Sequence, residues 1–498
     1  MKKLLSLLAF SGILWISSCS DDDPIDADPE VTAPAAATVT SGQSINVSFP
    51  YIALSGFASS SVTENGGTTT VVTDGVAGET SGAIMVSFTA GEAGAGSITL
   101  TVTDANGKTG SATAVLTITE TAATPVISVR GSIEGTVNWT ADNIYQLDTR
   151  VTVVDGATLN IAPGTVIKGS PGQSASATAL LVARGGTLNA RGTASLPIIF
   201  TASSDPIDPA DIAAGNYAST TNPSQTGLWG GIIILGKAPI TGKAENEGGT
   251  ETTDLAELQI EGIPSSDESG LYGGEEPEDN SGTISYISIR HGGTNIGAGN
   301  EINGLTLGGV GSGTSISNVE VVANADDGIE FFGGNVSVDG ALIWNSFDDS
   351  MDTDQDWTGS VTNFIIISPN TGSAFELDGP EGDRTRGQNH TFSEGVIFGG
   401  ADIDAIVDWD DDTNATLTNL YFFGITAGRI DSFGGNGAEA STNWETDLAD
   451  NSGGFFDGVD DGVITYGVAV GSKSHGPSAA DFAWTWAGNS GELTDLGL

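Results

Sequence analysis

The sequence has a single cysteine among its 498 residues, Cys19, and so lacks a second thiol for an internal disulfide. Basic residues are also scarce, because 15 lysines and arginines stand against 64 aspartates and glutamates, which gives a formal net charge of −49. Such a surface repels a phosphate backbone, so we exclude nucleic acid as a partner. The three histidines are too scattered along the chain to predict a zinc site.

No apolar run is long enough to span a membrane as a helix, which takes about 20 residues. Residues 1–18 instead have the order of a signal peptide: two lysines, an apolar run over residues 4–16, and small residues before Cys19. The end of this run resembles the lipobox of bacterial lipoproteins. The resemblance implies cleavage before Cys19 and lipidation of its thiol; the alternative is an ordinary signal peptide with a chance cysteine.

Residues 19–32 form an acidic, flexible tether after the predicted cleavage site. The stretch Ser20-Asp21-Asp22-Asp23 resembles the signal that sends lipoproteins of the Bacteroidetes group to the outer face of the outer membrane. We therefore expect a lipid-anchored protein of the outer membrane that faces the cell exterior.

Residues 33–121 alternate apolar and polar side chains, with turn residues every 8 to 12 positions. The clearest hairpin joins residues 97–103 to residues 112–119 through Asp104-Ala105-Asn106-Gly107. This pattern predicts an Ig-like or PKD-like β-sandwich that acts as a spacer.

Residues 125–498 consist of short apolar strands separated by corners rich in glycine, a residue type that numbers 71 in the chain. Similar tripeptides recur 22 to 24 residues apart, each before a strand, at 317–319, 339–341 and 362–364, and again at 418–420. This spacing is typical of the coils of a right-handed, single-stranded parallel β-helix, in which corner asparagines stack. We place a C-terminal cap at about 436–498, and the whole chain is predicted to be all-β.

Four segments carry a family resemblance: residues 227–240 (GLWGGIIILGKAPI), 286–293 (YISIRHGG), 301–321 and 326–334 (DDGIEFFGG). Together they resemble a widespread family of secreted bacterial β-helix lipoproteins without an agreed activity. The resemblance implies the fold and secretion, and it supplies no catalytic residues.

Superposing the predicted coils places acids on acids, because Glu330, Asp352, Glu376, Asp408 and Asp431 occupy equivalent positions. Charges about 4.8 Å apart repel by about 3.5 kcal/mol at an effective dielectric near 20, so such a ladder needs cations, shared protons or basic partners. Clustered carboxylates suit Ca²⁺, and we predict it as the bound ion. The alternative is that the acids accept backbone N–H bonds at corners while facing water. The candidate ligands are Asp326, Asp327, Glu330, Asp348, Asp349, Asp352, Asp354, Glu376, Asp378 and Asp408.

Three tryptophans, Trp344, Trp357 and Trp409, lie on the same coils as the acids. If exposed, they would form a strip on which sugar rings stack; if buried, they would fill the core. With the acids, they favour a cell-surface rod that binds or adheres to extracellular polysaccharide.

An enzyme is the alternative function, because a polysaccharide lyase or glycoside hydrolase of the pectin-lyase-like type also uses carboxylates on a β-helix. Asp348, Asp349 and Asp352 are the candidate acids of a hydrolase, and Arg384 or Arg386 would be the base of a calcium-dependent lyase. The polygalacturonase pattern is incomplete, since Arg429-Ile430 is followed by Asp431 where that pattern has a lysine. A structural surface component is the third reading.

Overall fold

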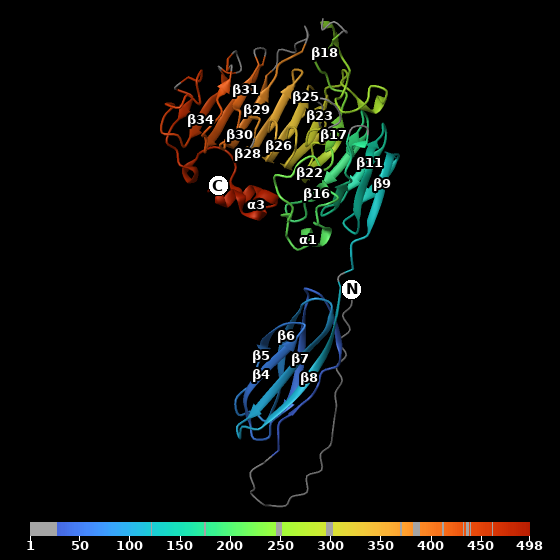
Figure 1. The fold of residues 1–498 in the computed structure, drawn as a ribbon, viewed down its shortest axis with the longest axis vertical. Coiled ribbons are helices and arrows are strands. Elements are labelled where there is room, and N and C mark those ends of the chain that lie inside the picture. Colours follow the sequence, from blue (N-terminus) through green and yellow to red (C-terminus); the bar gives the residue numbers. More distant parts are fainter. Residues whose placement is uncertain are drawn as a thin grey trace, which may run out of the picture. The chain divides into compact units, whose positions relative to one another are not determined.

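The computed structural model describes residues 27–498 except 121, 174–175, 246–250, 295–301, 369–370, 382–388, 411–412, 432, 435–437, 439 and 461. Cys19, Arg384 and Arg386 therefore lie outside the described residues. The chain divides into two compact units, Met1–Ala123 and Thr124–Leu498 (Figure 1). Among the described residues, no helix has both the length and the apolar composition needed to cross a membrane.

The N-terminal unit contains two four-stranded sheets around one core. One sheet has the order β1 (Glu30–Val31), β3 (Ser44–Ile52), β6 (Ser81–Ala90), β5 (Gly67–Thr73), and the other β2 (Ala37–Thr40), β8 (Thr109–Thr119), β7 (Gly94–Asp104), β4 (Phe57–Asn65). The predicted hairpin is confirmed, because β7 pairs with β8 and Asp104 Oδ1 accepts hydrogen bonds from the backbone of Asn106 and Lys108. The Ig-like assignment stays a prediction.

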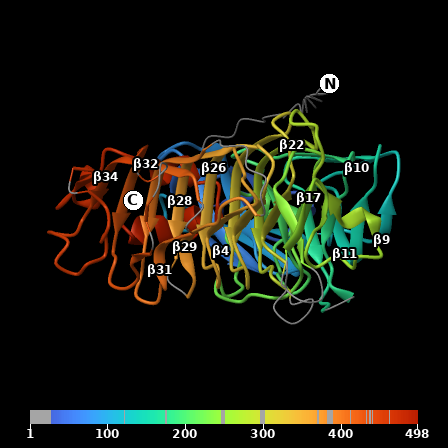
Figure 2. The ribbon, with the colours of Figure 1, turned by 90° about the horizontal axis from the view of Figure 1, so that it is seen from above.

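The C-terminal unit is built on one sheet of 23 strands in the described residues, whose paired strands are parallel (Figure 2). These strands are β9 (Val126–Ile133), β10 (Thr136–Trp139), β11 (Ile144–Val153), β12 (Thr158–Ile161), β13 (Val166–Gly169), β14 (Leu180–Val182), β15 (Thr187–Arg191), β16 (Ile198–Ala202), β17 (Ile232–Leu235), β22 (Gly282–Arg290), β23 (Leu305–Gly308), β24 (Ser315–Val322), β25 (Ile329–Phe332), β26 (Val338–Trp344), β27 (Met351–Asp354), β28 (Ser360–Ile367), β29 (Ser373–Leu377), β30 (His390–Phe398), β31 (Ala405–Trp409), β32 (Ala415–Phe423), β33 (Ile430–Asp431), β34 (Thr442–Thr446) and β35 (Ile464–Thr465).

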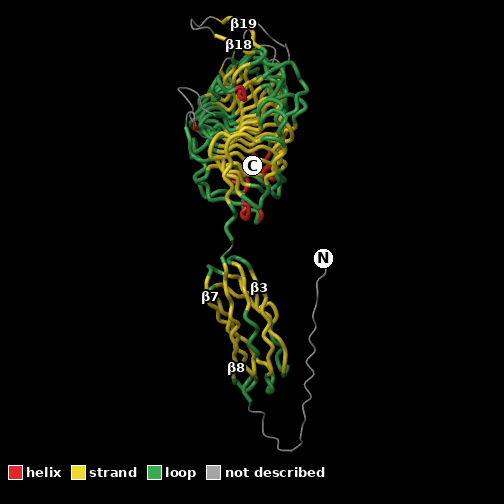
Figure 3. Tube along the Cα trace, turned by 90° about the vertical axis from the view of Figure 1, so that its right-hand side faces the viewer, coloured by secondary structure: helices red, strands yellow, loops and turns green. Residues whose placement is uncertain are grey.

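Strands pair with the equivalent strand of the next coil, which from β22 to β34 is the second strand along the chain, as in β24–β26–β28 and β25–β27–β29. The coils stack on one another, as the strands of this unit show in Figure 3. The predicted period is confirmed, because Ser317 pairs with Asp339 and Asp339 with Thr362. The unit is therefore a parallel β-helix with an apolar interior.

The long strands β24, β26, β28, β30 and β32 each bend at one residue with positive φ: Asn318 (54°), Gly340 (85°), Asn363 (58°), Glu394 (54°) and Asn419 (55°). Asparagine and glycine tolerate this backbone conformation best, which explains the repeated tripeptides. The predicted amide stacking is confirmed at one step, where Asn443 Nδ2 donates to Asn419 Oδ1 over 3.0 Å.

We call the side formed by β14, β17, β23, β25, β27, β29, β31 and β33 the acidic face. An insertion between β17 and β22 adds β18 (Gly242–Glu245), β19 (Glu251–Leu255), β20 (Leu258–Gln259), η2 (Glu268–Gly270) and β21 (Leu271–Tyr272). Tyr272 of this insertion packs with Phe332 of the acidic face, at a ring-centroid distance of 5.9 Å. A short helix, α1 (Pro209–Ala213), precedes β17.

The C-terminal segment differs from the predicted cap. β34 and β35 continue the coil, and η3 (Val470–Ser472), η4 (Ala479–Phe482), α3 (Trp486–Ser490) and α4 (Glu492–Asp495) follow. Phe482, Trp484 and Trp486 pack against apolar side chains on the outer side of β24, β26 and β28. The last turns of the chain thus cover one side of the β-helix, because that side would otherwise expose a broad apolar surface.

Candidate functional site

Acidic residues occupy equivalent positions on five strands of the acidic face. Glu330 of β25 pairs in register with Asp352 of β27, and the row continues through Glu376, Asp408 and Asp431. The neighbouring Ile329 and Phe331 are fully buried in the interior, so alternation along the strand turns Glu330 outward. The alignment predicted from the sequence is therefore confirmed.

Two further acids, Asp327 and Asp349, lie at the corners that lead into β25 and β27. Asp349 N donates to Asp327 Oδ1 over 2.9 Å, and Ser373 N donates to Asp349 Oδ1 in the next coil. These corner acids accept backbone N–H groups, as one sequence interpretation expected. They do not face water, however, because Asp327 is 7% and Asp349 4% exposed.

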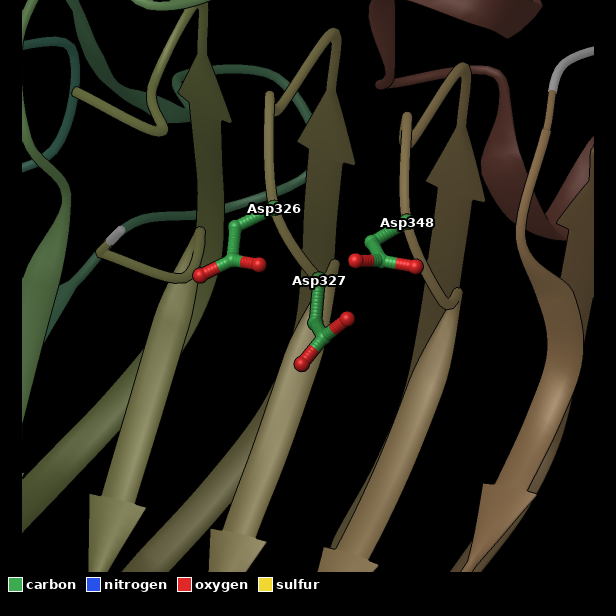
Figure 4. Close-up of side chains that lie close together, drawn as sticks. All are labelled: Asp326, Asp327 and Asp348. Carbon is green, nitrogen blue, oxygen red and sulfur yellow. The ribbon is translucent and has the colours of Figure 1, made fainter. Parts of the chain in front are cut away.

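Five acids form what we call the Asp327 cluster: Asp326, Asp327, Glu330, Asp348 and Asp352. It contains two triads, Asp326–Asp327–Asp348 and Asp327–Glu330–Asp352. Within each triad, one carboxylate oxygen from every residue lies within 4.8 Å of the corresponding oxygens of the other two. Figure 4 shows the first triad, in which Asp326 and Asp348 flank Asp327 on adjacent coils. Asp327 belongs to both triads, and the exposed Asp348 opens the cluster to solvent.

Burial and mutual repulsion dominate the electrostatics of the cluster. Both effects raise the pKa values of Asp327, Glu330 and Asp352 well above those of ordinary carboxyl groups. The nearby acids follow the same trend: burial raises the pKa of Asp354 to about 8, and a hydrogen bond with Asp349 raises that of Glu376 to about 10. Burial also raises the pKa of Asp378 to about 6.

The buried acids have no basic ion-pair partner among the described residues. None of the ion pairs between described residues involves Asp327, Glu330, Asp349 or Asp352. The largest effects of neighbouring charges on Asp327, Glu330 and Asp352 come from other carboxylates. Without a cation, Asp327, Glu330 and Asp352 therefore favour their protonated forms, as in the hydrogen bond between Glu330 and Asp352.

The residues of the cluster fit a hard divalent cation. All of its side chains offer carboxylate oxygens, which Ca²⁺ and Mg²⁺ prefer. Asp352 Oδ1 is buried without a hydrogen-bond partner, which is rare for a buried polar atom. A cation beside Asp352 would satisfy this oxygen and neutralise the charge of its neighbours. The assignment of Ca²⁺ stays a prediction.

Comparison with known proteins places the fold in a family. The family model described as "Pectate-lyase like beta helix domain" matches residues 131–428. The chain belongs to the pectate-lyase-like β-helix family. A Yersinia enterocolitica family 28 exopolygalacturonase is similar at 10% identity, with a TM-score of 0.15 over 84% of this chain and 92% of that chain. A likeness this weak carries no argument about function. A search of curated proteins finds no match.

The predicted tryptophan strip of this β-helix protein is wrong. Trp344, Trp357 and Trp409 are 5%, 1% and 2% exposed. Trp357 stacks on Phe331 at 4.0 Å between ring centroids, and its Nε1 donates to the carbonyl of Val336. Trp357 and Trp409 fill the interior of the coil, whereas Trp344 lies on its outer side under the C-terminal segment. Burial of such large apolar rings stabilises the fold more than exposure would.

The remaining predicted site residues are spread along the same face. Asp354 is the last residue of β27, and Asp378 directly follows β29 in the next coil. Asp378 N donates a hydrogen bond to Thr353 O. Asp408 is exposed, two coils away from Asp352. These three acids extend the row beyond the Asp327 cluster and belong to neither triad.

Sequence reasoning missed Asn303, which lies one coil before Asp327. Its Nδ2 donates to Glu330 Oε2, and its Oδ1 accepts a hydrogen bond from Asp327 N over 3.3 Å. The signal was present, because Asn303-Gly304 repeats the pattern of Asp327-Gly328. Asn303 thus closes the cluster at its N-terminal side with an amide in place of a carboxylate.

Proposed function

We propose that this chain is a cell-surface lipoprotein whose β-helix binds Ca²⁺ in the Asp327 cluster and uses it to bind extracellular polysaccharide. The observation that carries the proposal is Asp327 itself, a buried acid shared by two carboxylate triads. Like charges about 4.8 Å apart repel by about 3.5 kcal/mol at an effective dielectric near 20. A divalent cation turns this repulsion into attraction.

The chemistry of the cluster supports a role in binding sugars. Asp326, Asp327 and Asp348 would hold the ion on the solvent side, while Glu330 and Asp352 would hold its buried side. A cation held by these side chains would supply a positive centre for sugar hydroxyl or carboxylate oxygens, which the chain's own negative surface would otherwise repel. Because Trp344, Trp357 and Trp409 are buried, sugar rings do not stack on them in the proposed binding mode.

The N-terminal sequence supports the location. A lipid on Cys19 would hold the protein at the outer face of the outer membrane, and residues 19–32 and 33–121 would separate the β-helix from the lipid surface. Metabolic labelling with a fatty acid tests this part: the wild-type chain takes up the label, and Cys19→Ser does not. Labelling of both chains, or of neither, contradicts the anchor.

Polysaccharide cleavage is the second candidate, favoured by family membership and by Glu376. Its half-buried carboxyl is hydrogen-bonded to Asp349 and has its pKa raised to about 10, so at neutral pH it carries a proton that it can donate. A general acid of this kind is one of the two carboxyl groups that glycoside hydrolysis needs. Release of shortened products, lost in Glu376→Gln, would establish this activity.

Retention on immobilised polysaccharides tests the binding function. We expect at least one extracellular polysaccharide to retain the protein in 10 mM CaCl₂ and to release it in chelator. Asp327→Asn should pass through the same column in calcium. Retention that chelator leaves unchanged, or that Asp327→Asn preserves, contradicts the proposal.

A further inference from the structure

The outer side of six successive strands carries a regular array of hydroxyl groups. β22, β24, β26, β28, β30 and β32 lie side by side and pair in parallel without a register shift (Figure 2). Two outward positions of each coil form two columns, which together we call the hydroxyl array. One column contains Thr283, Ser315, Ser337, Ser360, Thr391 and Thr416, and the other Ser285, Ser317, Asp339, Thr362, Ser393 and Thr418.

The sheet beneath the hydroxyl array holds it rigid. On every strand, the residue between the two columns points into the core and is at most 3% exposed: Ile284, Ile316, Val338, Val361, Phe392 and Leu417. Adjacent parallel strands lie about 4.8 Å apart, and alternate residues of one strand lie about 6.6 Å apart. The hydroxyl groups therefore repeat in two directions, over about 24 Å along the stack of coils.

The hydroxyl array carries a charge at one position only. Asp339 is its single acid, and Asp339 Oδ1 accepts a hydrogen bond from Asn363 Nδ2 over 2.7 Å. Arg191 of β15, which pairs with Ser285, lies one coil before the array and marks its end. On a chain with a net charge of −49, a surface with so little charge does not suit a charged partner.

Several of these hydroxyl groups are open to a ligand. Ser315, Thr362 and Ser393 make no side-chain hydrogen bond with another described residue, and each is exposed or half-buried. Neighbouring hydroxyl groups of one column also come within hydrogen-bond distance, because Ser360 Oγ donates to Ser337 Oγ over 3.1 Å. The array thus offers donors and acceptors at short, repeated intervals.

A groove of about 330 Å³ borders the hydroxyl array at β24, β26 and β28. Ser315, Ser337 and Ser360 of the array line it, together with Asn335. Asn335 Oδ1 is buried and has no hydrogen-bond partner among the described residues. A buried acceptor of this kind requires an ordered water molecule, and the groove has room for one. Such a water lies beside the hydroxyl groups of the array and extends their pattern.

A partner that covers the whole array must repeat in two directions and must bind through neutral hydrogen bonds. A single polymer chain repeats in one direction, and a protein surface does not repeat. Two kinds of solid meet both conditions: ice and a crystalline neutral polysaccharide. The array favours ice, because its two columns contain no aromatic side chain on which sugar rings stack. Ice consists only of donors and acceptors, and water bound to a rigid array takes up the spacing of that array.

We propose that the hydroxyl array is an ice-binding surface, on which a layer of ordered water joins the chain to the face of an ice crystal. Threonine side chains have few rotamers in a strand, so ordering them costs little entropy. This activity goes beyond the proposed function and does not depend on calcium, because the Asp327 cluster lies at β25 and β27, outside the array.

Adsorption of the whole mature chain to ice tests the surface. A fluorescently labelled chain is exposed to a growing single crystal of ice, and thermal hysteresis is measured on a seed crystal in the same solution. The test variant Thr362→Tyr places a large ring in the middle of the array. Thr117→Tyr makes the same change at an exposed position of β8 in the N-terminal unit and is the matched control. The melting temperature of each variant shows that it is folded.

We expect the wild type and Thr117→Tyr to adsorb to ice and to produce thermal hysteresis, and Thr362→Tyr to lose both. Asp339→Thr completes the array and should increase the hysteresis, an effect that a purely structural role of these side chains would not produce. Failure of the wild type to adsorb, full adsorption of Thr362→Tyr, or a decrease in Asp339→Thr overturns the proposal. Retention on microcrystalline cellulose without adsorption to ice also overturns it and identifies a polysaccharide surface.

The variant Asp327→Asn separates this proposal from the proposed function. It should adsorb to ice as strongly as the wild type, in CaCl₂ and in chelator. If calcium binds and the wild type does not adsorb to ice, the ice-binding surface is wrong and the metal site is supported. If the wild type adsorbs and calcium does not bind, the metal site is wrong and the ice-binding surface is supported.

Discussion

Replacing Asp327 by asparagine changes one atom in the residue that both carboxylate triads share. An asparagine Oδ1 can still accept the hydrogen bond from Asp349 N, so the corner should keep its geometry. The substitution removes one negative charge from a group whose charged neighbours are all acids. It therefore separates the effect of charge from the effect of packing.

The structure predicts that the stability of Asp327→Asn relative to the wild type differs in sign with and without calcium. In chelator, Asp327→Asn removes repulsion of up to about 3.5 kcal/mol for each ionised neighbour at about 4.8 Å, so the variant should be as stable as the wild type or more stable. In 10 mM CaCl₂, a site with a Kd of about 10⁻⁴ M stabilises the wild type by about 2.7 kcal/mol. For a β-helix of about 375 residues, Thr124–Leu498, this corresponds to a rise of about 3 °C in Tm.

Differential scanning calorimetry measures both effects on the same samples. We expect calcium to raise the Tm of the wild type by about 3 °C and that of Asp327→Asn by less than 1 °C. Asp339→Asn is the control, since Asp339 is exposed and its Oδ1 accepts a hydrogen bond from Asn363 outside the cluster. A wild type that does not respond to calcium, or an Asp327→Asn variant with the full response, refutes the reasoning.

Three further predictions concern pH, the core and a buried ion pair. In chelator, folded Asp378 and Asp354 hold protons that the unfolded chain releases near pH 4. The stabilisation from these protons is greatest at low pH. It is lost as pH rises through about 6 and about 8, where Asp378 and Asp354 titrate in the folded state. Urea unfolding should give a free energy a few kcal/mol lower at pH 9 than at pH 5, and a flat or rising profile contradicts the assignment. Trp357→Ala should cost about 3–5 kcal/mol in the same assay without changing retention on polysaccharide at 10 °C, and a selective loss of retention would restore its role in binding. Arg290→Met leaves the buried Glu320 without its ion pair at 3.8 Å and should cost about 3–5 kcal/mol, most of which the added Glu320→Gln recovers; no recovery would mean that packing dominates.

The coil register was predictable because the repeat is carried by corner residues with a backbone constraint. Asn318, Gly340 and Asn363 occur at the expected spacing, and each has a positive φ. The coil of β30 escaped prediction because Glu394 occupies the same corner. Its carboxylate accepts a hydrogen bond from Asn419 Nδ2, so glutamate makes a contact with the next coil at a corner where asparagine or glycine is usual.

The acid row was predictable for the same reason, since residues at equivalent positions of successive coils must stack. Burial was not predictable from the repeat alone. Trp344 points away from the interior, yet residues from η4 onward cover it, and its ring lies 5.9 Å from that of Trp486. Contacts between segments more than 100 residues apart leave no periodic signal in the sequence.

The most direct test of the central claim is the number of calcium ions that the chain binds. Isothermal titration of chelator-treated wild type with CaCl₂ should give at least one site with a Kd at or below about 1 mM. Asp327→Asn should bind one ion fewer, and Asp339→Asn should match the wild type. Absence of binding at millimolar calcium, or equal stoichiometry in the wild type and Asp327→Asn, would contradict a metal centre at Asp327.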